Sequence, residues 1–170
     1  MLEALTSKTV GIYRAPEARC YDPTPPFGPA ERYPEYPFEW EESSRGQGQV
    51  YAMLRGLFQC MGLDSGHSGQ PSWNPLGEVI RPGDRVLIKP NWVSHAADSG
   101  APAEALVTHP SLLRAVLDYV AVALAGEGQI ILGDSPLQSA DFGEIRRQGG
   151  INALADWWSA RSGIPLELID

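Results

Sequence analysis

Basic residues and cysteines are scarce in this chain of 170 residues. Its 13 Lys and Arg are outnumbered by 21 Asp and Glu, which gives a formal net charge of −8. Nucleic acids and anionic membranes are bound through basic surfaces, so this balance argues against either as a partner. The two cysteines, Cys20 and Cys60, stand outside any Cys-x-x-Cys spacing. We therefore expect no iron–sulfur cluster and no zinc site built from cysteine.

Long apolar runs and the common nucleotide-binding motifs are also absent. No run approaches the ~18 residues of a membrane span, and residues 1–9 lack the basic start and apolar stretch of a signal peptide. We therefore expect a cytoplasmic protein. Neither a glycine-rich nucleotide-binding signature nor the Gly-x-Ser-x-Gly elbow of serine hydrolases occurs. Dinucleotide binding and serine hydrolysis lose their usual sequence support.

Three short polar signatures occupy the middle of the chain. They are residues 88–91 (Ile-Lys-Pro-Asn), 108–110 (Thr-His-Pro) and 133–136 (Gly-Asp-Ser-Pro). Apolar runs at 86–88 and 130–132 come before the polar residues of the first and third, and a helical pattern separates the two runs, as in a βαβ unit. Strands in such a unit are parallel, so the polar residues that follow them should lie at one edge of the sheet, where open α/β folds bind ligands.

The alternation of strand and helix patterns predicts an α/β domain with a mainly parallel sheet of about four strands and helices on both faces. Strands are expected at residues 8–14, 86–88, 130–132 and 165–169, and helices at 48–63, 110–124, 141–148 and 151–161. Because the chain ends directly after an apolar strand, we expect residues 1–170 to form a single domain that is part of a larger one.

Residues 15–49 are dense in proline and aromatic residues. Prolines at this density exclude an interior helix or a central strand, and disordered linkers carry few aromatic rings. We expect an insertion that lies across the domain with its rings packed inward. It could serve as a lid or as a strap that binds a protein partner.

Six residues are expected at the carboxyl-terminal edge of the sheet: Arg14, Lys89, Asn91, His109, Asp134 and Ser135. Lys89 offers a positive charge to an anion, and Asn91 offers both a donor and an acceptor. A helix expected to start at Pro136, with Ser135 as its N-cap, would add free N–H groups. Together these residues predict a small anionic ligand, a phosphate or a carboxylate.

Asp134 and His109 are the candidate catalytic residues. A carboxylate repels an anion unless a cation lies between them, so Asp134 is expected to bind a divalent cation such as Mg²⁺ or to act as a base. His109 would exchange protons near neutral pH. Whether the protein is an enzyme stays open at this point.

Each of these residues also has a purely structural explanation. Asp134 could accept hydrogen bonds from backbone N–H groups in a turn, Lys89 could be a solvated charge, and the His109 ring could bond the backbone at a helix start. A transition-metal site from His95, Asp98, His109 and Asp134 matches no known ligand spacing. The alternatives to ligand binding are a non-catalytic interaction module, with a protein partner or a second copy, and an inactive fragment.

The order of the three signatures, led by the turn at residues 81–84 (Arg-Pro-Gly-Asp), resembles the N-terminal half of a bacterial and archaeal family catalogued as domain of unknown function three-six-two. The resemblance covers residues 79–151 best. It implies an α/β domain longer than this chain, often fused to a ferredoxin-like cluster module whose cysteines are absent here. It draws attention to Lys89, Asn91, His109 and Asp134 without naming a reaction.

Overall fold

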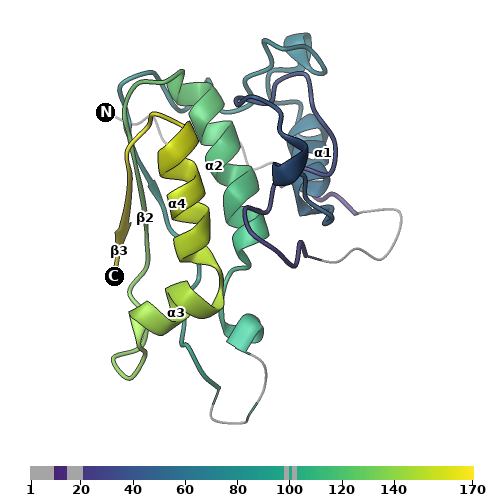
Figure 1. The fold of residues 1–170 in the computed structure, drawn as a ribbon. Coiled ribbons are helices and arrows are strands. Elements are labelled where there is room, and N and C mark those ends of the chain that lie inside the picture. Colours follow the sequence, from purple (N-terminus) through teal and green to yellow (C-terminus); the bar gives the residue numbers. More distant parts are fainter. Residues whose placement is uncertain (1–9, 15–20, 98–99, 101–102) are drawn as a thin grey trace.

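A computed structural model describes residues 10–14, 21–97, 100 and 103–170, and within them the chain forms a parallel three-stranded sheet with four α-helices (Figure 1). The strands are β1 (Arg85–Ile88), β2 (Gln129–Gly133) and β3 (Leu166–Ile169), in the order β1-β2-β3. The helices are α1 (Val50–Cys60), α2 (Pro110–Leu124), α3 (Phe142–Gln148) and α4 (Ile151–Arg161). Short 3₁₀ turns lie at η1 (Glu42–Ser44), η2 (Ser65–His67) and η3 (Ala103–Leu106). The α/β class and the parallel sheet are confirmed.

The central strand β2 is the most buried, as its apolar run predicts. Ile130 pairs with Val86 on one side and Leu166 on the other, which sets the register of the whole sheet. The strand ends at Gly133, where a Cβ atom would lie 2.7 Å from the backbone oxygen of Ile169. The glycine of the third signature is therefore needed for β2 and β3 to approach each other at their carboxyl ends.

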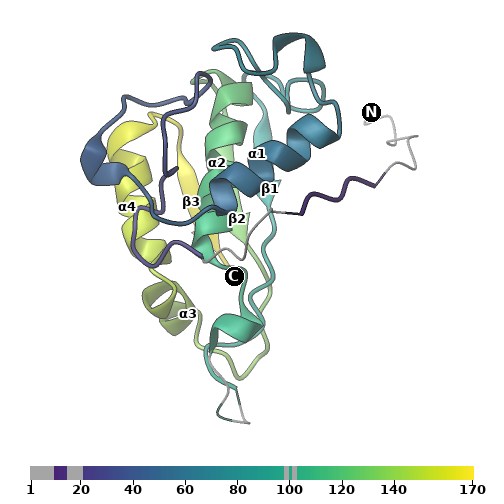
Figure 2. The same ribbon diagram turned by 90° about the vertical axis from the view of Figure 1, so that its right-hand side faces the viewer.

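The molecule has three layers. The sheet packs against α2 and α4, and α1 packs on the far side of α2, as the two perpendicular views show (Figure 2). The main core lies between the sheet and the α2–α4 layer. Its most buried members include Leu117, Leu124, Ile130, Leu132, Leu154 and Trp158.

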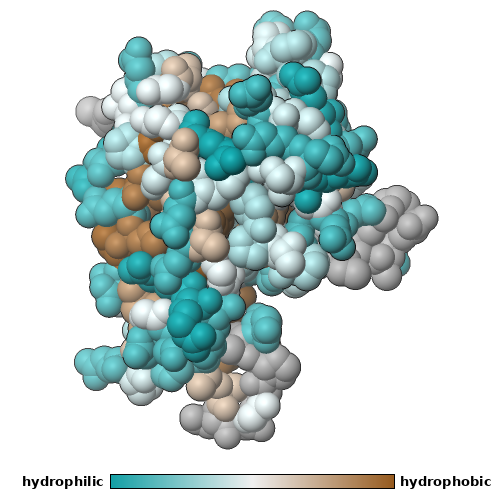
Figure 3. All heavy atoms as spheres, in the orientation of Figure 1, coloured by the Kyte–Doolittle hydropathy of each residue, from teal (hydrophilic) through white to brown (hydrophobic). Residues whose placement is uncertain are grey.

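Two expectations about the sheet need correction. Helices were expected on both faces, but among the described residues they cover only one. On the other face Leu87 is 62% exposed, and a hydrophobic area surrounds β2 and β3 on that side of the molecule (Figure 3). About four strands were expected, and three are found in the part of the chain that the structure describes. The proposed first strand lies partly outside the described residues, and its residues 10–14 have no regular structure.

Residues 10–14 lie along α1 instead of joining the sheet. The ring of Tyr13 lies so close to Gly56 that a Cβ atom there would be 2.6 Å from it. Gly11 likewise lies close to Met61, just beyond the helix. Gly11 and Tyr13 therefore face α1, whereas the apolar residues Val10 and Ile12 are 80% and 82% exposed. Sequence periodicity does not distinguish such a segment from a strand of the sheet.

The described part of the proline- and aromatic-rich segment, residues 21–49, packs rings inward, as predicted. Phe27 and Tyr33 are buried, and the Phe38 ring meets the rings of Trp157 and Trp158 edge-on at 5.3 and 5.5 Å. Burial of aromatic area is a sufficient reason for these rings to be present.

A buried arginine ties this segment to the helices. The Arg114 guanidinium donates to the Asp118 carboxylate and to the Pro26 carbonyl oxygen, both at 2.8 Å. It also donates to the Tyr36 hydroxyl at 2.7 Å and lies 3.6 Å from the centre of the Trp157 ring. Arg114 and Asp118 are both fully buried, so a charged pair on α2 holds the segment in place.

Candidate functional site

The three signatures meet at the carboxyl-terminal edge of the sheet. Lys89, just after β1, places its Nζ 2.5 Å from the Oδ1 atom of Asp134, just after β2. Asn91 and Thr108 exchange two hydrogen bonds: the Thr108 N–H donates to the Asn91 carbonyl oxygen, and the Asn91 N–H donates to Thr108 Oγ1, at 2.8 and 2.9 Å. Residues from all three signatures are thus linked by direct contacts, as the parallel geometry predicts. We call this group (Lys89, Asn91, Thr108 and Asp134) the rim.

Asp134 organises the rim. Its side chain is only 7% exposed, and it accepts hydrogen bonds from the backbone N–H groups of Trp92 and Ser135 at 2.7 and 2.8 Å. Burial alone would raise the pKa of Asp134, but these hydrogen bonds and the one from Lys89 together hold the pKa below its usual value. Asp134 therefore acts as a charged acceptor that fixes the loops after β1 and β2, which is the structural explanation given for it above.

Lys89 and Asn91 are the rim residues that face solvent. The Lys89 side chain is 63% exposed although its ammonium group contacts Asp134, and Asn91 is exposed as well. An ammonium group carries three donors. Lys89 can therefore contact Asp134 and still offer charge and hydrogen bonds to a molecule arriving from solvent.

Ser135 does not have the structural setting expected for it. No helix starts at Pro136; the next helix, α3, starts at Phe142 with Asp141 as its N-cap. The chain turns away because the Leu137 N–H donates to the Val93 carbonyl oxygen at 3.1 Å, which ties residue 137 to the loop after β1. The helical N–H groups that were expected to bind an anion beside Ser135 are consequently not formed there.

Arg14 also lacks its expected setting. It was placed at the end of a first strand, but it follows the segment that lies along α1. Arg14 is exposed, and no sheet strand brings it to the rim.

His109 lies at the same edge of the sheet but faces a different hollow. It is the N-cap of α2, where its Nδ1 atom accepts from the Ser111 N–H at 3.2 Å, and its ring stacks on Tyr21 with centroids 4.3 Å apart. It lines a hollow of about 220 Å³ together with Phe27 and the turn between α3 and α4. Burial lowers the pKa of His109, against the opposing effect of Asp22 and Glu104. A histidine that caps a helix with its ring is the structural alternative stated above.

Lowering the pH from about 7.5 to about 5.5 is expected to destabilise the protein through His109. Its folded-state pKa is lowered, so the unfolded chain binds the proton more readily. The contribution of His109 is complete above the unfolded-state pKa of about 6.5 and is lost as the pH falls through the folded-state pKa. His109→Asn keeps an acceptor at the N-cap but does not titrate, so urea denaturation across this range should show a shallower pH dependence for the variant. Identical slopes would contradict the assignment.

The described residues contain no group of three or more His, Cys, Asp and Glu side chains arranged to hold a metal ion. His95 uses its Nδ1 atom to accept from the Asp141 N–H at 2.9 Å, and Asp98 lies outside the described residues. His95, His109 and Asp134 are therefore each engaged in local hydrogen bonds. Among the described residues, these three side chains do not form the transition-metal site that was considered above.

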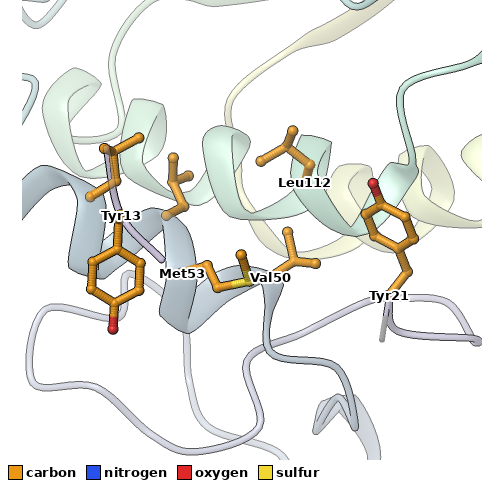
Figure 4. Close-up of a pocket in the computed structure, with 7 residues that line it drawn as sticks. Tyr13, Tyr21, Val50, Met53 and Leu112 are labelled. Carbon is orange, nitrogen blue, oxygen red and sulfur yellow. The ribbon is translucent and has the colours of Figure 1, made fainter. Parts of the chain in front are cut away.

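An apolar groove between α1 and α2 was not predicted from the sequence. The groove measures about 400 Å³ and is lined by seven residues: Tyr13, Tyr21, Val50, Met53, Leu54, Leu57 and Leu112 (Figure 4). Met53, Leu54 and Leu57 recur at helical spacing within the helix expected at residues 48–63, a pattern typical of a core-facing surface. The spacing identified the apolar face of α1 correctly, but part of that face is open. Tyr21, which stacks on His109, closes one end.

The comparisons with known proteins agree with the resemblance. Residues 86–162 match the family model described as "Domain of unknown function (DUF362)". A curated relative, the "Thylakoid-associated protein sll1697" of Synechocystis sp. (strain ATCC 27184 / PCC 6803 / Kazusa), is 29% identical over 107 residues, which cover 63% of this chain and 27% of the relative. The chain thus spans about a quarter of that protein. No solved structure matches. Within the described residues no helix is long and apolar enough to cross a membrane.

Proposed function

Taking residues 86–162 as a segment of the family described as domain of unknown function (DUF362), we propose that the rim binds a small anionic ligand, a phosphate or a carboxylate, through Lys89 and Asn91. The observation that carries this proposal is the contact between Lys89 and Asp134. A carboxylate next to an anion site requires a cation between them, and the Lys89 ammonium occupies that position. Lys89 thereby removes the need for a metal ion at Asp134.

The rim suits this role because it is fixed before any ligand arrives. Asp134 accepts hydrogen bonds from backbone N–H groups in the loops after β1 and β2. The Asn91–Thr108 pair joins the loop after β1 to the residue before His109. Binding residues held by packed strands and by such supporting hydrogen bonds lose little freedom when a ligand binds. The edge itself is where open parallel sheets present their ligands.

Replacing Lys89 with Gln is expected to weaken the binding of inorganic phosphate about tenfold or more, because a hydrogen bond to a charged group contributes about 1.5–3 kcal/mol. Isothermal titration calorimetry measures the affinity. Arg85→Gln is the matched control: Arg85 begins the strand that Lys89 follows, and its side chain is 67% exposed, but it lies at the opposite end of β1 from the rim. Equal affinities for the wild-type and Lys89→Gln proteins would remove Lys89 from the site.

A titration with Mg²⁺ alone tests whether Asp134 binds a divalent cation, as was expected from the sequence. Asp134 already accepts three hydrogen bonds, and an incoming ion would have to displace the Lys89 ammonium. We therefore expect no saturable heat from Mg²⁺ with the wild-type protein. Saturable binding that Asp134→Asn abolishes would restore the metal and revise the role of Lys89.

A further inference from the structure

Two neighbouring hollows next to the rim have several lining residues in common. The smaller, about 50 Å³, is lined by His95, and the larger, about 220 Å³, by His109. Four residues line both: Glu104, Val107, Gln148 and Gly149. The hollows therefore lie next to each other, between the chain leading into α2 and the turn from α3 to α4. We call the two hollows together the histidine cleft.

The protein fixes the tautomer of both histidines. The Nδ1 atom of His95 accepts from the Asp141 N–H at 2.9 Å, and the Nδ1 atom of His109 accepts from the Ser111 N–H at 3.2 Å. A ring nitrogen that accepts a hydrogen bond carries no proton, so the proton of each neutral ring resides on Nε2. Nε2–H is the group that each ring has left to offer to a molecule in the cleft.

The cleft also contains donors and an acceptor of other kinds. Arg147 and Gln148 contribute a guanidinium and an amide from the end of α3. Glu104, from η3, contributes a carboxylate to both hollows. Arg147 is partly occupied by a 2.7 Å contact with Glu144, but it remains mostly exposed. The set is rich in donors and has one strong acceptor, which suits a ligand that has a negatively charged group and one hydrogen-bond donor of its own.

We propose that the histidine cleft binds a small hydroxycarboxylate, with its carboxylate hydrogen-bonded to the Nε2–H groups of His95 and His109 and its hydroxyl donating to Glu104. The size of the cleft sets an upper limit on the ligand: even the larger hollow is below the roughly 300–1,000 Å³ of sites for drug-sized molecules. The ligand is therefore a compound of a few carbon atoms. This site goes beyond the anion site at the rim and does not use Lys89.

Glycolate and acetate are matched probes because they differ by one hydroxyl group. Long-range ¹H–¹⁵N NMR of the full chain at about pH 7.5 should show Nε2–H tautomers for His95 and His109. Glycolate should shift both sets of ring resonances in a saturable way and bind about threefold to tenfold more tightly than acetate, as one hydrogen bond predicts. Glu104→Ala should make the two affinities equal.

His109→Asn separates a binding role from a structural one. Asn keeps an acceptor at the N-cap of α2 but removes the Nε2–H donor, so the fold should persist while glycolate no longer shifts the His95 resonances. His67→Asn is the control, because His67 lies far along the chain in η2 and bonds Asp64. If glycolate shifts neither histidine at tens of millimolar, or shifts His95 equally in wild type and His109→Asn, the proposed site is overturned.

The proposals for the rim and for the histidine cleft can be tested independently. Lys89→Gln should leave glycolate binding at the cleft unchanged, and His109→Asn should leave phosphate binding at the rim unchanged. If either variant lost both phosphate binding and glycolate binding, the proposal of two separate sites would be overturned.

Discussion

Replacing Arg114 with Met is expected to destabilise the fold by about 3–5 kcal/mol, the usual effect of removing one partner from a buried ion pair. The substitution leaves the Asp118 carboxylate fully buried without its cation. It also removes the hydrogen bonds to the Pro26 carbonyl and the Tyr36 hydroxyl, which hold the proline-rich segment against α2. Urea denaturation followed by tryptophan fluorescence measures the change.

The pH dependence and a double variant identify the cause. Burial already raises the pKa of Asp118 against the effect of Arg114, and loss of Arg114 should raise this pKa further. A folded-state pKa above the unfolded value makes stability fall as pH rises, so the loss in Arg114→Met should be larger at about pH 8 than at about pH 5. The double variant Arg114→Met, Asp118→Leu should recover most of the unfolding free energy that Arg114→Met loses. A loss below about 1 kcal/mol, typical of exposed pairs, would mean that water reaches the pair.

Replacing Leu132 with Ala is expected to cost about 2–5 kcal/mol of unfolding free energy, whereas Leu87→Ala should change it by less than about 0.5 kcal/mol. The two leucines lie on adjacent strands and project from opposite faces of the sheet. Leu132 is 1% exposed and packs in the core under α2 and α4, while Leu87 is 62% exposed. The same substitution therefore compares the two faces directly.

Equal losses for the two leucines would contradict the one-sided packing. Such a result would mean that something covers the face that carries Leu87 in solution. All-parallel sheets are commonly covered on both faces. Equal losses would therefore indicate a covered Leu87 face, and unequal losses an open one. Sedimentation velocity on Leu87→Ala shows whether self-association contributes.

Patterns local to the chain predicted the parallel sheet and the meeting of Lys89 and Asp134 at one of its edges. The apolar run 130–132 could only be a buried strand or helix, and its length and the glycines around it favoured a strand. Because β1 and β2 are parallel, the residues that follow them, Lys89 and Asp134, lie at the same edge of the sheet, where they form an ion pair. The strand-end argument needs only the direction of the strands, which sequence supplies.

Contacts between distant segments were beyond the reach of those patterns. The helix expected at Pro136 is replaced by a turn because the Leu137 N–H bonds Val93, forty-four positions earlier in the chain. Nothing in the sequence pairs Arg114 with Pro26. His109 was grouped with the rim because it starts a helix at that edge, but the direction of its ring is set by Ser111 and Tyr21. Edge position was predictable, and side-chain direction was not.

A titration of backbone amide resonances with inorganic phosphate tests the anion site at the rim most directly. The account predicts saturable shifts concentrated at residues 89, 91, 92, 108, 134 and 135, which disappear in Lys89→Gln and persist in Arg85→Gln. Shifts that cluster elsewhere on the chain, or that survive the loss of Lys89, would contradict it.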